Sequence, residues 1–311
     1  MISLLGHRHQ AQTLFLRMVT TVLVLATAGG CSPFESMPSD GSPGTYLASF
    51  DHDGVRREAI VYAPEAATGA GAAPMVLNFH GYGGTAADHM ESAADMRSLA
   101  DQEGFLLVYP QGTRLDGSPH WNSAAPSDNN KSSADDFGFI AQLIEAIGSS
   151  YELDADRVYA AGYSNGGMMS FGLACYLGDR IAAVASVSGA MLDDIGVECT
   201  PPHPTSVVTL HGTADSVLPY EGGEGMRSAE EAAEFWAELN EITEAPTSTS
   251  TTDRGTQVES FVHTGGAGGT EVHHHRVVGG GHVWFEIEID GADTNRLIWD
   301  VVSRFGRSGA L

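Results

Sequence analysis

A serine lies between two glycines at a point where the residue pattern changes from strand to helix. Residues 156–162 (D-R-V-Y-A-A-G) read as a short buried strand and residues 168–176 as a buried helix, so residues 162–166 (G-Y-S-N-G) form the turn between them. A tight turn there forces Ser164 into a strained backbone conformation, and the flanking glycines leave room for the strand and the helix to approach. Such a motif also arises by chance in a chain with 38 glycines, so a nucleophilic role for Ser164 depends on whether its partners exist.

A serine hydroxyl is a weak nucleophile that needs a base, and the base needs a carboxylate to orient it. Asp215 follows the strand-like residues 206–210, and His282 follows residues 273–278 and three glycines. Each of these two residues alone could be an ordinary loop residue. Reactive groups of such sheets lie past the carboxyl ends of strands, and the order serine, acid, histidine matches one known arrangement of a triad. We therefore expect Ser164, Asp215 and His282 to act together.

Attack on a carbonyl carbon also requires hydrogen-bond donors for the oxyanion that develops. One donor is expected to be the backbone N–H of Asn165, directly after the nucleophile. The second is expected in the loop N-F-H-G-Y-G-G-T (residues 78–85), with the backbone N–H of Tyr82 as the donor. His80 lies far upstream of the serine and is expected to be structural rather than a base.

Three aromatic residues are candidate substrate contacts. Tyr163 is beside the nucleophile, and Trp284 lies two residues after His282. Trp121 lies in a long polar loop after a strand candidate, where it could line a substrate cleft or only pin the loop.

A run of three histidines falls on the last strand candidate. Successive side chains of a strand point to opposite faces, so only His273 and His275 share one face. No cysteine or carboxylate cluster stands beside them in the sequence, which makes a poor zinc site. We expect neither a metal site nor a cofactor.

The N-terminal residues predict export. Arg8 and Arg17 precede an apolar run at residues 18–28, which is too short for a comfortable membrane span, and A-G-G-C-S follows. Cys31 after two glycines resembles the position at which bacterial lipoproteins are cleaved and lipidated, and plain secretion is the alternative. Residues 1–30 are therefore assigned to a signal peptide of lipoprotein type. Export would place the protein at the bacterial cell envelope or outside the cell.

Residues 31–44 are assigned to the lipidated cysteine and a flexible linker, because the segment is rich in proline, serine and glycine. The catalytic domain would then occupy residues 45–311. Two cysteines remain in it, Cys175 and Cys199, for which an oxidising compartment favours a disulfide, with two buried thiols as the alternative.

The charge balance excludes some partners. There are 15 basic and 40 acidic residues, which gives a net charge of −25. Nucleic acid and anionic lipid both need a basic surface, so no nucleic acid is expected to bind. Contact with a membrane is expected only through the N-terminal anchor, and the protein is expected to be a monomer.

Strand-like and helix-like segments alternate along the chain. The strand candidates are continuous and apolar, which predicts an α/β fold in one domain, with a mainly parallel central sheet and helices on both faces. Strands are expected at residues 56–62, 75–79, 105–109, 156–162, 182–188, 206–210 and 273–278, and helices at residues 86–101, 134–149, 165–177, 229–239 and 294–305. Two low-complexity segments, residues 247–252 and 264–270, are expected to be surface loops.

Together these motifs resemble the polyhydroxybutyrate depolymerase-like esterases, a family that includes secreted feruloyl and acetylxylan esterases. The resemblance covers residues 46–305 and rests on H-G-Y-G-G-T, Y-P-Q-G-T, A-G-Y-S-N-G-G-M-M-S, L-H-G-T-A-D-S-V-L-P-Y-E-G-G and G-G-G-H-V-W. It implies an α/β-hydrolase fold, the same three catalytic residues and a Cys175–Cys199 disulfide. The chain departs from the family's pattern at Tyr82, where a cysteine is common, at Phe285, where a proline is common, and in lacking a further C-terminal cysteine pair.

We therefore expect an exported serine esterase that cleaves an extracellular polyester or similar esters. A feruloyl or acetylxylan esterase acting on plant polysaccharide is the alternative. Two hypotheses come from other classes. A serine peptidase could use the same triad, but no propeller or large cap segment is visible in the sequence. An inactive surface-binding lipoprotein would normally have lost a member of the triad, and all three are present.

Overall fold

The computed structural model describes residues 34–69, 71–124 and 131–311. Along each central strand, successive apolar side chains point alternately into two hydrophobic cores, one on each face of the sheet. In β4 (Ala73–Phe79), Met75 and Leu77 belong to one core, and Val76 between them belongs to the other. This period of two is the pleat of a strand, and it buries both faces of the sheet. Because both faces are buried, most positions of these strands are apolar, which explains the continuous apolar runs in the sequence.

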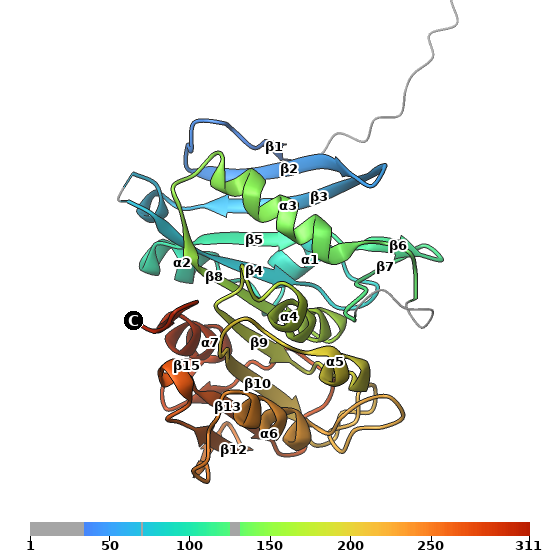
Figure 1. Cartoon of the computed structure of the whole chain (residues 1–311), viewed down its shortest axis with the longest axis vertical. Helices are drawn as coiled ribbons and strands as arrows, with labels where there is room; N and C mark the ends of the chain where they lie inside the picture. The colour runs from blue at the N-terminus through green and yellow to red at the C-terminus, as the bar shows by residue number, and fades with distance from the viewer. Residues whose placement is uncertain (1–33, 70, 125–130) are drawn as a thin grey trace, which may run out of the picture. The chain divides into compact units, whose positions relative to one another are not determined.

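Most of the described strands form one large sheet. Its eleven strands follow the order β1-β2-β3-β5-β4-β8-β9-β10-β13-β12-β11 (Figure 1). Neighbours from β5 to β13 run parallel, whereas β2, β3, β12 and β11 pair antiparallel towards the two edges. The remaining strands of the sheet are β1 (Glu35–Ser36), β2 (Gly44–His52), β3 (Val55–Ala63), β5 (Leu106–Pro110), β8 (Leu153–Tyr163), β9 (Ala183–Val187), β10 (Ser206–Gly212), β11 (Thr247–Asp253), β12 (Thr256–His263) and β13 (Val272–Val277). Three small hairpins pair β6 (Thr113–Leu115) with β7 (Ser118–His120), β14 (Glu288–Ile289) with β15 (Ala292–Asp293), and β16 (Phe305–Gly306) with β17 (Gly309–Ala310).

Helices cover both faces of this sheet. The core on one face is closed by α3 (Asp136–Gly148), α4 (Asn165–Tyr176) and α6 (Ala229–Leu239), with α5 (Asp193–Glu198) beside them. The other core is closed by α1 (Ala86–Met90), α2 (Arg97–Glu103) and α7 (Thr294–Val302) (Figure 1). The predicted α/β architecture, a mainly parallel sheet between two helical layers, is confirmed.

Two predicted elements differ from the structure. The helix expected at residues 86–101 is broken between α1 and α2, because side chains of the sheet bind the backbone there. Asn78 donates to the carbonyl of Ala94 at 3.0 Å, and the hydroxyl of Tyr109 accepts from the N–H of Met96 at 3.1 Å. The threonine-rich segment expected to be a loop is β11, which pairs with β12. Threonine favours extended backbone, and this edge strand needs no apolar face.

The segment predicted as a flexible linker is attached to the domain from Phe34 onward. β1 pairs with β2, and the N–H of Met37 donates to the carbonyl of Leu47 at 3.1 Å. The hydroxyl of Tyr151 donates to the carbonyl of Ser42 at 3.2 Å. The predicted signal peptide and Cys31 lie outside the described residues.

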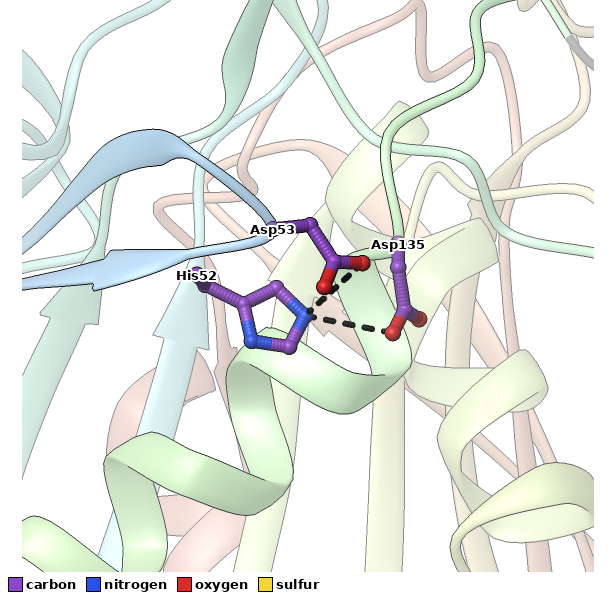
Figure 2. Close-up of side chains that lie close together, drawn as sticks. All are labelled: His52, Asp53 and Asp135. Atoms are coloured by element: carbon purple, nitrogen blue, oxygen red, sulfur yellow. Dashed lines mark hydrogen bonds and ion pairs between the residues drawn. The ribbon is translucent and has the colours of Figure 1, made fainter.

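The hairpin of β2 and β3 is tied to the start of α3 by the ring of His52 (Figure 2). The two ring nitrogens of His52 lie 2.9 Å from Gln142 Oε1 and 3.1 Å from Asp135 Oδ2. Asp135 also caps α3 by accepting from the N–H of Gly138 at 2.9 Å. The next residue, Asp136, forms a buried ion pair with Arg57 at 2.6 Å. These contacts fix the first turn of α3 against the sheet.

The disulfide that the resemblance implies is present. Cys175 in the last turn of α4 bonds to Cys199, directly after α5. The bond joins α5 to the helix that follows the G-Y-S-N-G turn. In the part of the chain that the structure describes, no helix is long and apolar enough to cross a membrane.

The turn from β8 into α4 depends on two close backbone approaches. A Cβ atom on Gly162 would lie 2.3 Å from the carbonyl carbon of Gly166. A Cβ atom on Gly166 would lie 2.2 Å from the carbonyl oxygen of Phe79 and 2.7 Å from that of His80. Only glycine fits at either position. The first turn of α4 therefore packs directly on the end of β4.

Replacing Gly166 with alanine tests this approach. The added methyl group would overlap backbone atoms that cannot move aside, so we expect misfolding or a loss of at least ~2 kcal/mol in the free energy of unfolding. Gly281→Ala is the matched control, because a Cβ there meets nothing within 4 Å. Urea denaturation of both variants gives the comparison, and equal stability of the two would contradict the close approach.

Candidate active site

Ser164 lies at the sharp turn between β8 and α4. Its φ of 53° and ψ of −118° lie in a region that non-glycine residues rarely adopt. Its N–H donates to the carbonyl of Val187 in β9 at 2.9 Å, which anchors the turn to the neighbouring strand. This conformation costs of order 1–3 kcal/mol, and the surrounding packing has to hold it.

The structure brings Ser164, Asp215 and His282 into one hydrogen-bonded row. His282 Nε2 lies 2.8 Å from Ser164 Oγ, and His282 Nδ1 lies 2.7 Å from Asp215 Oδ2. The side chain of Asp215 is fully buried, and that of His282 is 14% exposed. Asp215 is acceptor-only when ionised, so Nδ1 carries the proton and Nε2 is free to accept from the serine hydroxyl.

The loop after β10 fixes Asp215. Its Oδ1 accepts from the N–H groups of Val217 at 2.8 Å and Leu218 at 2.9 Å. Burial acts to raise the pKa of Asp215, but the hydrogen bonds from His282, Leu218 and Val217 outweigh burial and hold the pKa below its usual value. The carboxylate therefore stays ionised at neutral pH and can stabilise an imidazolium at His282.

The glycine loop after β13 presents His282. The N–H of Gly279 donates to Thr213 Oγ1 at 2.8 Å, and the N–H of Ala214 donates to the carbonyl of Gly280 at 2.9 Å. The hydroxyl of Tyr163 donates to the carbonyl of His282 at 2.8 Å. Tyr163, which the sequence suggests as a substrate contact, thus also holds the backbone of His282.

The loop after β4 lies against the serine. A Cβ atom on Gly81 would stand 3.3 Å from Ser164 Cβ. The N–H of Gly112 donates to His80 Nε2 at 3.0 Å, so the proton of His80 is on Nδ1, which donates to the carbonyl of Gly81 at 2.7 Å. Burial lowers the pKa of His80 to about 4, so the ring is neutral. His80 is structural, as its place in the sequence predicts.

Two backbone N–H groups beside the serine are free to donate. The Gly81–Tyr82 peptide is planar, and its carbonyl points at His80, so the N–H of Tyr82 points the opposite way. Asn165 is the first residue of α4, where an N–H has no partner within the helix. Within the described residues, neither N–H has a hydrogen-bond acceptor.

Two hollows are lined by the residues on either side of Ser164 in the chain, Asn165 in one and Tyr163 in the other. One, of about 500 Å³, includes Trp121, Asn165, Met168, Leu192, Leu218 and Met226 in its lining. The other, of about 370 Å³, includes Gly81, Tyr82, Ala93, Tyr163, Val283 and Trp284. An ester that spans Ser164 would have space for a group on each side.

The two predicted tryptophan contacts line these hollows but are largely buried. Trp121 is 1% exposed, and its Nε1–H donates to the carbonyl of His80 at 3.0 Å. Its backbone is clamped by the side chain of Asn165, which accepts from its N–H at 2.8 Å and donates to its carbonyl at 3.1 Å. Trp284 is 8% exposed and donates to Asn295. Trp121 therefore pins its loop as well as lining a hollow.

One group of side chains in the described part of the chain could hold a metal ion. Ligand atoms of His52, Asp53 and Asp135 lie within 4.8 Å of one another (Figure 2). They belong to the hairpin of β2 and β3 and to the start of α3, whereas the Ser164 row stands at the ends of β8, β10 and β13. They have no part in the chemistry of that row.

The histidine run at residues 273–275 is bonded to protein groups instead. His273 Nε2 lies 2.7 Å from Glu271 Oε2, and His274 Nδ1 lies 2.7 Å from Thr209 Oγ1. His275 Nδ1 lies 2.8 Å from Ser260 Oγ.

Sequence reasoning gave no role to Gln111, which lies beside the His80 ring. Its Nε2 is 3.2 Å from His80 Nε2, and its Oε1 accepts from the N–H of Ala86 at 3.0 Å. The signal for it is its position directly after β5, at the same edge of the sheet as the loop after β4.

Known esterases are similar to this chain in sequence. Feruloyl esterase B of Piromyces equi is 31% identical over 260 residues, which is 80% of this chain and 45% of that protein. The bifunctional acetylxylan esterase/xylanase XynS20E of Neocallimastix patriciarum is 31% identical over 172 residues, which is 55% of this chain and 23% of that protein. The chain thus spans less than half the length of these two relatives.

An acetyl xylan esterase from Aspergillus awamori has a similar structure, with a TM-score of 0.58 at 16% sequence identity, over 79% of this chain and 94% of that one. This likeness concerns the fold and confirms the predicted α/β-hydrolase fold. Residues 65–253 match the phospholipase/carboxylesterase family, a segment that includes Ser164 and Asp215 and ends before His282. Since the match covers more than half of the chain, the protein belongs to the phospholipase/carboxylesterase family.

Proposed function

We propose that this protein is a serine esterase in which Ser164 is the nucleophile, His282 the base and Asp215 the acid. The observation that carries the proposal is the row of hydrogen bonds of 2.8 Å and 2.7 Å from Ser164 through His282 to Asp215. A neutral imidazole held in this tautomer can take the serine proton, and an ionised carboxylate stabilises the imidazolium that results.

The reaction proceeds in two steps. Ser164 Oγ attacks the ester carbonyl carbon while His282 Nε2 takes its proton, and the oxyanion accepts from the N–H groups of Tyr82 and Asn165. The tetrahedral intermediate then breaks its bond to the alcohol oxygen, which leaves with the proton from His282. Water, deprotonated by His282, attacks the acyl-enzyme and releases the acid and the free serine. No metal or cofactor takes part in these steps.

We propose phenolic or acetyl esters of plant polysaccharide as the substrates, in preference to a polyester. The sequence motifs favour a polyhydroxybutyrate depolymerase, but the relatives reported above are named feruloyl and acetylxylan esterases. The two hollows beside Ser164 support an ester with an acyl group on one side and a sugar on the other. The export and the lipidation at Cys31 that the sequence predicts would fit a polymeric substrate outside the cell.

Hydrolysis of p-nitrophenyl acetate and methyl ferulate by protein lacking residues 1–31 tests the proposal. Ser164→Ala is expected to lose at least ~10³-fold in kcat, because no nucleophile remains. Ser170→Ala is the matched control, since this buried serine of α4 donates only to the carbonyl of Gly166. Wild-type and control rates should agree.

Activity that survives in Ser164→Ala would contradict the assignment of Ser164 as the nucleophile. If the wild-type protein cleaves none of p-nitrophenyl acetate, methyl ferulate and acetylated xylan, the result would favour the hypothesis of an inactive surface-binding lipoprotein. Cleavage of peptides at rates comparable to esters would favour the peptidase. If the protein is active, a higher kcat/KM for polyhydroxybutyrate than for methyl ferulate and acetylated xylan would favour the hypothesis of a polyester substrate.

His80 provides a test of the oxyanion donors. His80→Ala removes the shorter of two hydrogen bonds to the Gly81 carbonyl, the other coming from the N–H of Gly84 at 3.1 Å, so we expect kcat to fall by up to ~10²-fold while KM changes little. His80→Asn keeps an N–H near the position of Nδ1 and should recover most of the rate. Steady-state kinetics measures the rate, and thermal unfolding shows whether a loss comes from lower stability. An equal loss in both variants would show that the effect does not come from this N–H, and no loss in either would show that other contacts hold the peptide.

A further inference from the structure

A group of buried polar side chains lies on the face of the sheet that α6 covers and has no role in the reaction so far. His274 of β13 bonds through its two ring nitrogens to Thr209 Oγ1 and Tyr220 Oη, both at 2.7 Å. The ring of Tyr220 meets the ring of His211 edge to face, with centroids 5.9 Å apart. All four side chains belong to residues no more than 5% exposed. The group ends at His211, next to the loop that carries Asp215.

The ring of His211 has one definite tautomer. Its Nε2 lies 2.8 Å from the carbonyl of Leu218 and 3.4 Å from Asp215 Oδ2. Both neighbours are acceptors, so Nε2 must carry a proton. Burial lowers the pKa of His211 below its usual value, so the ring donates this proton while remaining neutral.

The Asp215 carboxylate therefore faces donors on both oxygens. Oδ1 accepts from the N–H groups of Val217 and Leu218. Oδ2 accepts from His282 Nδ1 at 2.7 Å and also lies 3.4 Å from His211 Nε2. His211 also binds the carbonyl of Leu218, so a single N–H joins the two ends of the turn that holds the carboxylate.

We propose that His211 is a positioning residue, which orients the Asp215 carboxylate towards His282 through a neutral imidazole N–H while its ring packs against Tyr220. The inference rests on the proposed triad. A cation in this position would pair with Asp215 and compete with the imidazolium at His282. A neutral donor shares the carboxylate without supplying a competing charge.

The consequence is a measurable change in the titration of His282. Among the described residues, Tyr163 lies against the His282 ring and Tyr220 against the His211 ring. His274 bonds to Tyr220 on its far side, and the guanidinium of Arg276, the neighbour of His211 on β13, lies over the Tyr220 ring and pairs with Glu230 and Glu259. Neither tyrosine is charged near neutral pH, because burial raises the pKa of both. Removing the N–H of His211 leaves Asp215 with one donor fewer, so Asp215 attracts the imidazolium more strongly and His282 holds its proton to higher pH.

The test compares three variants of the described domain. His211→Leu removes the donor, and His211→Gln places an amide N–H near the position of Nε2. His274→Gln is the matched control, since it is equally buried in the same group but does not touch Asp215. Histidine ¹⁵N NMR follows the titration midpoint of His282, and the pH dependence of kcat/KM for p-nitrophenyl acetate follows the same proton in turnover.

We expect the midpoint and the acidic limb of the profile to move up by about 0.5 in His211→Leu, with kcat at neutral pH ~10-fold lower. His211→Gln should restore both, and His274→Gln should lower the melting temperature without moving the midpoint. If His211→Leu loses stability with no change in the midpoint, or if His211→Gln behaves like His211→Leu, the proposal is overturned.

Two further conditions keep the test decisive. Should His211→Leu fail to fold, His211→Phe keeps the ring contact with Tyr220 and gives the same comparison. The NMR titration needs no turnover, so it reports on His211 even if the Ser164→Ala assay shows that the proposed esterase activity is wrong.

Discussion

The contact between the first turn of α4 and the end of β4 is the constraint on which the site depends. Gly166 lies so close to the carbonyls of Phe79 and His80 that no side chain fits between them. This approach places the N–H of Asn165, the hydroxyl of Ser164 and the Gly81–Tyr82 peptide within one small volume. Ser164 keeps its strained φ because this packing and the neighbouring strands hold the turn in one backbone conformation.

Neutral histidines hold two of the loops around the site, through His80 after β4 and His211 before Asp215. Burial lowers the pKa of His80 to about 4 and that of His274 to about 3, and it also lowers the pKa of His211. These rings stay uncharged, and their hydrogen bonds to backbone carbonyls and to side chains hold the neighbouring segments in place. In the triad, by contrast, His282 lies between a hydroxyl and a buried carboxylate, where a proton can move. The neighbours of each histidine ring therefore determine whether its proton stays in place, as in the structural histidines, or can be transferred, as in His282.

The sequence predicts the parts that depend on local pattern and chain order. Ser164, Asp215 and His282 could be chosen because each follows a strand whose apolar run is visible, and parallel strands bring their carboxyl ends together. The break between α1 and α2 could not be predicted, because Asn78 and Tyr109 of distant strands cause it. β11 carries no alternation to recognise, since an edge strand of threonines and serines has no apolar face. Tyr163 and His211 were missed as positioning residues because their roles depend on backbone carbonyls that only the fold brings near.

The measurement that tests the central claim most directly is covalent labelling with a fluorophosphonate, followed by intact-mass analysis and peptide mapping. The account predicts a single adduct on Ser164, formed slowly when His282 is replaced by alanine, since the imidazole no longer accepts the serine proton. The absence of an adduct on the wild-type protein, or an adduct on another residue, would contradict it.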